Sequence, residues 1–217
     1  MCWNKEISLN TFLFSSGSIL FLYYVNTYTK YKSTLYFDGS IYKYLFLLSF
    51  TMMQLLEFFL WKSIENNDKK MNYLFSIIGL GLVLIQPILS MRMTNRIYKS
   101  LIPIYLLITA GYLLLRYILN PIKFETKIGA NKHLAWNWLD MKGYWQIYIF
   151  LWFFFIEYTD SNIIFPIGAA VPFFYTYYKY RKTNEWGSIW CWLINSFCLF
   201  LLIDVLIISP YKKNECK

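Results

Sequence analysis

The sequence predicts an all-α integral membrane protein, a seven-transmembrane-helix bundle. Of its 217 residues, 58% are hydrophobic and only 15% are charged, whereas soluble domains carry about 25% charged residues. The mean hydropathy of +0.37 reflects long apolar runs, several of which approach the roughly 20 residues needed to cross a hydrocarbon core. The chain therefore lacks the polar residues that would cover a water-facing surface.

The first four predicted spans are apolar runs bounded by polar or charged residues. The first follows the charged N-terminal residues, and the second begins directly after Lys43. In the third span, Gly79 and Gly81 would let a neighbouring helix approach closely. These four spans cover residues 9–28, 44–61, 72–91 and 101–119.

The last three predicted spans cover residues 143–158, 163–180 and 186–208. The first two of these are short, and only residues 159–162 separate them, which predicts a tight helical hairpin. Proline residues in several spans are compatible with membrane helices, where kinks are tolerated. Together the seven spans form a single domain over residues 1–217.

The longest predicted connection, residues 120–142, contains the sequence KHLAWNWLDMKG. Apolar and aromatic residues such as Leu134, Trp136 and Trp138 alternate there with His133 and Asn137. This mixture favours an interfacial or re-entrant segment over a free loop.

The formal net charge of +9 does not indicate nucleic-acid binding, because the 21 basic residues are spread over short connections between apolar runs. Charges beside spans are typical of membrane topology and of contacts with anionic lipids. An odd number of spans places the chain ends on opposite sides, called here the N-terminal side and the C-terminal side. The N-terminal side holds more basic residues, which predicts a cytoplasmic N-terminus, and we expect that terminus to be retained because it lacks a signal-peptide core.

The four cysteines predict neither a metal site nor a cofactor. Cys2, Cys191, Cys198 and Cys216 show no metal-like spacing. Cys191 and Cys198 share one helical stripe with Ser188 and Asn195, which is typical of a small-residue packing seam, and Asn195 is the member that could line a polar path.

Polar residues inside the predicted spans fall at two depths. In MMQLLEFFLW of the second span, Gln54, Glu57 and Trp61 lie on one helical face near the N-terminal side. An ionisable group in hydrocarbon costs at least ~2.5–3.5 kcal/mol, so it needs a partner, water or a function. Arg116 is the expected ionic partner of Glu57.

Helix rise places further polar residues at each of these depths. Near the N-terminal side they are Arg116, His133 and Asp140; near the C-terminal side they are Gln86, Glu157, Asp160 and Asp204. Glu57 and Asp204 are therefore expected to be about 15 Å or more apart, which excludes a carboxylate pair sharing one proton.

Eight of the nine tryptophans, among them Trp61 and Trp136, fall in the N-terminal-side half of the predicted bundle. Such an arrangement is typical of an interfacial aromatic belt. An alternative is an aromatic-walled pocket above Glu57, suited to a cationic ligand.

The segments MCWNKEISLNTF, MQLLEFFLW, Gln86–Pro87 and HLAWNW resemble a family of small multi-pass membrane proteins. That family occurs in large DNA viruses of protists and in some algae, and it is known only as a domain of unknown function. The resemblance implies a multi-pass topology and a host or virion membrane. It implies no activity.

These patterns favour the binding or passage of a proton, cation or small cationic solute through a polar interior path, with membrane lipids as the other partners. Two alternatives stay open: an intramembrane enzyme using Glu57, His133 or Asp140 on a lipid headgroup, and a non-catalytic membrane organiser. The oligomeric state is not predicted. The residues expected to line the path are Gln54, Glu57, Trp61, Gln86, Arg116, His133, Trp136, Asn137, Asp140, Glu157, Asn195 and Asp204.

Overall fold

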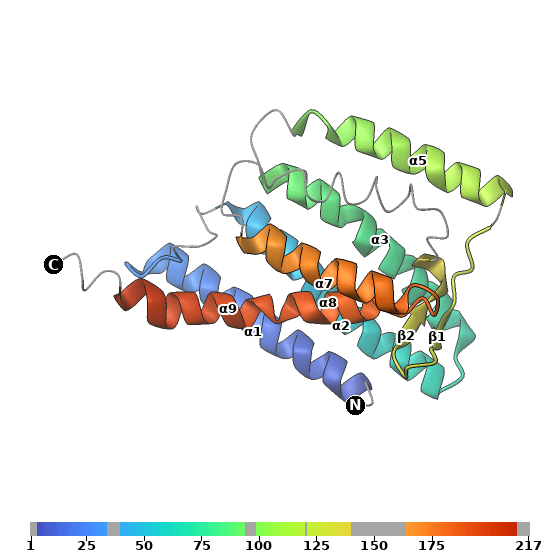
Figure 1. Cartoon of the computed structure of the whole chain (residues 1–217), viewed down its shortest axis with the longest axis horizontal. Coiled ribbons are helices and arrows are strands. Elements are labelled where there is room, and N and C mark those ends of the chain that lie inside the picture. Colours follow the sequence, from blue (N-terminus) through green and yellow to red (C-terminus); the bar gives the residue numbers. More distant parts are fainter. Residues whose placement is uncertain (1–3, 34–39, 94–98, 120, 140–163, 212–217) are drawn as a thin grey trace.

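The computed structural model describes residues 4–33, 40–93, 99–119, 121–139 and 164–211, most of which are helical (Figure 1). Its long helices are α1 (Lys5–Tyr28), α2 (Ile41–Glu65), α3 (Lys69–Met93), α5 (Ile102–Leu119) and α7 (Ile164–Tyr180). A last helical segment consists of α8 (Trp186–Asn195), α9 (Phe197–Ile203) and the π-helical turn η3 (Asp204–Ile208).

Five helical segments are long and apolar enough to cross a membrane: α1, α2, α3, α5 and the segment Trp186–Tyr211. The all-α class is thereby confirmed. The seven-helix count and membrane insertion stay predictions, because residues 143–158 lie outside the described residues and α7 has only 17 residues.

Two of the helices extend beyond their apolar runs because polar side chains cap them. The side chain of Asn4 accepts a hydrogen bond from the backbone N–H of Ile7 at 2.9 Å, so α1 begins at Lys5 rather than at residue 9. At the start of α3, the Asp68 carboxylate accepts a hydrogen bond from the N–H of Met71 at 3.0 Å.

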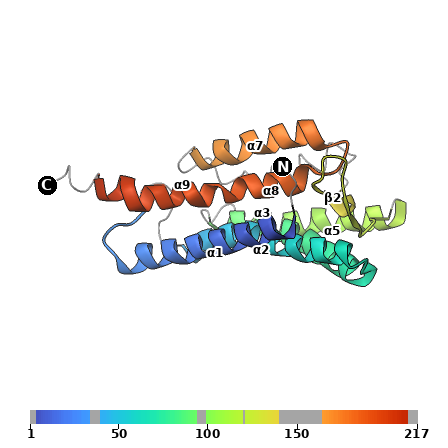
Figure 2. The ribbon, with the colours of Figure 1, turned by 90° about the horizontal axis from the view of Figure 1, so that it is seen from below.

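The helices pack in layers around α2 and α8. Helix α2 packs between α1 and α3, and α8 contacts α2 on one face and α7 on the other (Figure 2). Helix α5 lies outside α3, and Tyr105 is its one buried side chain. The start of α1 and the end of the red C-terminal helical segment lie far apart along the long axis of the molecule (Figure 1).

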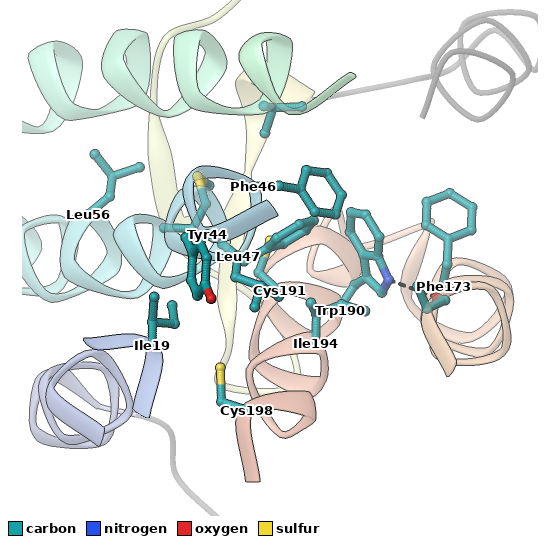
Figure 3. Packing of buried hydrophobic residues seen from close by; sticks show 14 of the residues in the cluster. Ile19, Tyr44, Phe46, Leu47, Leu56, Phe173, Trp190, Cys191, Ile194 and Cys198 are labelled. Carbon is teal, nitrogen blue, oxygen red and sulfur yellow. Dashed lines mark hydrogen bonds between the residues drawn. The ribbon is translucent and has the colours of Figure 1, made fainter. Parts of the chain in front are cut away.

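The core between α2, α7 and α8 is aromatic. The Trp190 ring meets the rings of Phe50 and Phe173 edge-on, with centroids 5.7 and 5.2 Å away. Its Nε1–H donates to the carbonyl of Ala169 at 3.2 Å, so the indole is satisfied inside the core (Figure 3). Trp190 thus connects α7 to the rest of the bundle.

The connection after α5 forms a β-hairpin, although its sequence pattern predicts an interfacial or re-entrant segment and no strands. Strands β1 (Thr126–Ile128) and β2 (Leu134–Trp136) pair antiparallel, with Thr126 opposite Trp136, and the short 3-10 turn η1 (Asn137–Leu139) follows. The stacked rings of Trp136 and Trp138, 4.9 Å apart, are buried. The prediction that this segment is no free loop therefore agrees with its packing against α3 and α8.

Gly79→Ala is expected to destabilise the fold by about 1–3 kcal/mol, because it overpacks the contact between α3 and the hairpin. A Cβ at residue 79 would lie 2.8 Å from both Leu56 and the Trp138 ring, which leaves no room for a methyl group. Gly81→Ala, two residues along the same helix, is the matched control, since its Cβ would meet nothing within 4 Å. Helix propensity alone would make Gly81→Ala neutral or stabilising by up to about 1 kcal/mol. Thermal unfolding in detergent measures both, and equal effects would contradict the close contact at Gly79.

Candidate functional site

Glu57 lies inside the bundle, with 2% of its surface exposed, where α2 faces α1 and α8. The side chains that interact with its carboxyl group are Ser188 of α8, Ser8 of α1 and Gln54 of α2. Both serines are buried, and the Gln54 side chain is fully enclosed. Three helices therefore direct neutral polar groups towards one carboxyl group.

Several polar atoms at this position make no hydrogen bond. Oε1 of Glu57 and both amide atoms of Gln54 have no hydrogen-bond partner within the described part of the chain, although the two side chains are close enough to interact. Unsatisfied buried polar atoms are uncommon in folded proteins and each requires a physical reason. The group around Glu57 therefore has unused capacity to bind a ligand.

Arg116 is not among the groups that contact Glu57. Arg116 belongs to α5, which lies beyond α3 and contacts it through Tyr105, whereas the contacts of Glu57 come from α1, α2 and α8. Helix rise gives depth but not which helices are neighbours, so two residues at one depth can lie on unconnected helices. The expected Glu57–Arg116 ion pair is absent from the described contacts.

A line of buried polar side chains continues from Glu57 between α1, α2 and α8. Oγ1 of Thr51 donates to Oδ1 of Asn195 at 3.3 Å, and the Asn195 amide also donates to the carbonyl of Cys191 at 2.7 Å. Further along the same line, Ser15 of α1 interacts with Cys198 of α9. We call this line the polar seam; its members are Ser8, Ser15, Thr51, Gln54, Glu57, Ser188, Cys191, Asn195 and Cys198.

The seam can be reached from outside the bundle. A groove of about 320 Å³ lies between α1 and the α8–α9 segment, and Ser15 and Asn195 contribute to its lining. Among the three cavities described, this is the one that meets the polar seam; none of the three is lined by Glu57.

Asp204 forms a second buried polar cluster towards the C-terminal side. It is fully buried at the start of η3 and accepts a hydrogen bond from the hydroxyl of Ser33 at 2.5 Å. The N–H of Ser33 in turn donates to the side chain of Asn26, whose amide donates to the Tyr44 hydroxyl. Tyr44 and Glu57 lie about 20 Å apart along α2 at ~1.5 Å of rise per residue, which agrees with the expected separation of the two acids.

An apolar layer separates the two polar groups. Leu22, Leu47 and Leu201 are almost completely buried between the level of Ser15 and that of Asp204. These three side chains, from α1, α2 and α9, therefore belong to the apolar core between the polar seam and the Asp204 cluster.

The buried tryptophans fill the core and do not line a cavity around Glu57. Trp136 packs against Gly187, where a Cβ would lie 2.7 Å from its ring, and Trp138 packs against Gly79. Trp61 belongs to the hydrophobic core cluster. An aromatic-walled pocket above Glu57 is thus not among the cavities described.

His133 belongs to a different cluster, at the tip of the hairpin. Its backbone N–H donates to the Glu185 carboxylate at 3.2 Å, and its ring meets Tyr180 at a centroid distance of 6.2 Å. The same carboxylate accepts hydrogen bonds from the backbone N–H and the side-chain amide of Asn131, at 2.9 and 2.6 Å. Glu185, which is completely buried, therefore anchors the hairpin turn to the start of α8.

Lowering the pH through about 6 is expected to destabilise the protein through His133. Burial lowers the pKa of His133 from its ordinary value, and the Glu185 carboxylate opposes this only in part. Because the unfolded chain takes up this proton at a higher pH than the folded chain, the stability contribution is complete above about pH 6.5 and is lost as the pH falls towards the lowered pKa. Thermal unfolding over this range measures it. His133→Gln should flatten the pH dependence, and an unchanged slope would assign it to another group.

The remaining predicted residues do not join Glu57. Asn137 begins η1 and bonds through its backbone to Glu125, and Gln86 is fully buried on α3 with no hydrogen bond to its amide among the described residues. Asp140 and Glu157 lie outside the described residues, as does Asp160. Of the predicted path, the structure therefore brings Gln54, Glu57 and Asn195 into one seam.

The sequence prediction omits Ser8, Ser15 and Thr51 of the polar seam, and also Glu185 of the hairpin cluster. Ser8 precedes the apolar run, but it lies seven residues before Ser15, so both fall on the same helical face. In the sequence, Glu185 looks like an ordinary charged residue between two spans. The feature that could have identified it is its position at the start of α8, where a carboxylate is favoured.

The described residues contain no group of three or more His, Cys, Asp or Glu side chains that could hold a metal ion. Comparison of the chain with family models, curated proteins and solved structures finds no match. The resemblance to the viral and algal membrane proteins therefore stays a prediction.

Proposed function

We propose that the protein binds and passes a small cation, a proton or a monovalent metal ion, along the polar seam between α1, α2 and α8. The observation that supports this best is the environment of Glu57. Its carboxyl group is buried among hydroxyl and amide groups, with no basic side chain among the contacts described. Since an ionisable group in hydrocarbon is costly, a bound cation is a direct means of compensating its charge.

The rest of the seam supports a path rather than an isolated site. Thr51 and Asn195 continue the polar line, and Asp204 supplies a second acid near the opposite side. The layer of Leu22, Leu47 and Leu201 separates the two, so passage requires this layer to open, as in pores that gate by a hydrophobic constriction.

The same contacts favour small-cation passage over an intramembrane enzyme and over the passage of an organic cation. An enzyme that uses Glu57 and His133 together needs both side chains at one cavity, whereas their described contacts belong to separate clusters. An organic cation needs more space than the described cavities offer beside Glu57. We infer a host or virion membrane from the sequence resemblance alone.

Flux through reconstituted protein tests the proposal. Purified protein in liposomes should carry either protons, followed with an internal pH-sensitive dye, or ²²Na⁺. Glu57→Gln should reduce the flux by about tenfold or more, equivalent to about 1.4 kcal/mol or more in the barrier. Glu65→Gln is the matched control, because Glu65 lies on the same helix but is exposed and pairs with Lys5. No flux of either ion, or a flux insensitive to Glu57→Gln, would overturn the proposal and favour a membrane organiser.

A further inference from the structure

We propose that Glu57, Gln54, Ser8 and Ser188 form a binding site for one dehydrated monovalent metal ion, with Na⁺ as the ion that fits best. The inference deepens the proposed function, on which it rests for the transport step. The site itself is argued from the contacts of these four residues.

The four side chains supply oxygen ligands from three helices. The Ser8 and Ser188 hydroxyls and the Gln54 amide surround the Glu57 carboxyl group, and each of the four side chains is at least nine-tenths buried. Oε1 of Glu57 and Oε1 of Gln54 accept no hydrogen bond from the residues described. Carboxylate, hydroxyl and amide oxygens are hard ligands that suit alkali and alkaline-earth ions.

The charge at the site selects a monovalent ion. Among the described residues, Glu57 is the one acid at this position, and the side chains that interact with it are neutral. A monovalent ion neutralises a single carboxylate, whereas a divalent ion would leave a net positive charge in a medium where charge is costly. Calcium sites use six to eight oxygen ligands, commonly with several carboxylates. Na⁺ therefore fits better than Ca²⁺.

The size of the site favours Na⁺ over a larger ion. The Gln54 side chain is fully buried and the other three ligands are nearly so, which makes a small cation the better fit among them. Cys191 lies near Glu57, but a single thiol without a histidine partner does not make a site for a soft metal. The unused acceptor oxygens of Glu57 and Gln54 are the atoms that a small hard cation would satisfy.

Equilibrium binding of ²²Na⁺ to the full-length protein in detergent tests the site. We expect saturable binding of one ion per chain, with K⁺ and Ca²⁺ competing less well than unlabelled Na⁺. Glu57→Gln should abolish binding. Ser188→Ala should weaken it by about tenfold, the change expected for about 1.4 kcal/mol. Glu65→Gln should leave it unchanged.

Size-exclusion chromatography and thermal unfolding must first show that the variants are folded. If Glu57→Gln does not fold, Na⁺ binding is compared in Ser188→Ala and Ser8→Ala instead. Absence of saturable binding, binding insensitive to these substitutions, or stronger competition by Ca²⁺ would overturn the site. Na⁺ binding without flux would support the binding site and contradict the proposed passage of ions. Proton flux without Na⁺ binding would support the passage of protons and contradict the Na⁺ site.

Discussion

Replacing Glu57 with glutamine is expected to raise the unfolding temperature of the protein in Na⁺-free detergent by several degrees. The carboxyl group is buried, and within the described part of the chain its Oε1 has no hydrogen-bond partner and its contacts include no basic side chain. Glutamine keeps the shape and hydrogen-bonding capacity of this side chain but not its ionisable group, which costs at least ~2.5–3.5 kcal/mol inside hydrocarbon, so the substitution should recover part of that cost. For a chain of this size each kcal/mol corresponds to about 2–4 °C.

The direction of this change separates a functional acid from a structural one. If the Glu57 carboxyl group serves to bind a cation, it destabilises the folded protein when no cation is bound, so its removal should stabilise the fold. If it serves to hold the helices together, its removal should destabilise the fold. Differential scanning fluorimetry on matched samples decides, with Glu65→Gln as the exposed control on the same helix. A fall of several degrees for Glu57→Gln would assign Glu57 to structure.

Added Na⁺ should reverse the order of the two unfolding temperatures, so that the wild-type protein becomes more stable than Glu57→Gln. Binding to the folded state stabilises it in proportion to the logarithm of the ion concentration, about 2.7 kcal/mol at a hundred times the dissociation constant. Glu57→Gln lacks the site and should not respond to Na⁺. Equal responses of the two proteins would place any bound ion elsewhere.

Sequence patterns predict the helices well because each helix needs a long apolar run. Residues 9–28 and 44–61 fall inside α1 and α2, and the differences lie at the ends, where Asn4 and other polar residues extend the helices. The hairpin is harder to predict from the sequence, because β1 and β2 have only three residues each and so give a short pattern. Its sequence signal is the alternation of Leu134, Trp136 and Trp138, which has the period of a strand.

The sequence predicts that the candidate site residues lie inside the bundle, but it does not predict which residues they contact. Glu57, Gln54 and Asn195 were expected inside the bundle, and all three are buried there. The expected partner Arg116 is on a helix that does not border Glu57, while the observed partners Ser8 and Ser188 are small residues that look like packing positions. Which helices become neighbours depends on packing over the whole chain, and hydropathy contains no information about it.

Replacing Glu185 with alanine is expected to destabilise the fold by about 2–4 kcal/mol. Its carboxylate is completely buried and accepts three hydrogen bonds, two from Asn131 and one from the backbone N–H of His133. Each hydrogen bond to a charged group contributes about 1.5–3 kcal/mol, but exposed Asn131 can recover part of this from water. Glu125→Ala is the matched control, because Glu125 lies directly before β1 of the same hairpin, is exposed, and its side chain pairs only with Lys127 among the contacts described.

Hydrogen exchange distinguishes two ways in which the hairpin can be held. If Glu185 anchors it, Glu185→Ala should accelerate exchange of the amides of Asn131 and His133 by at least an order of magnitude, while α2 keeps its protection. If the buried Trp136–Trp138 stack against Gly79 and Gly187 holds the hairpin instead, exchange should change little in Glu185→Ala and increase in Gly79→Ala. The close approach of Gly129 to Glu185, where a Cβ would lie 2.4 Å from the carboxylate, favours the anchor, since it leaves the turn no other position while that carboxylate is in place.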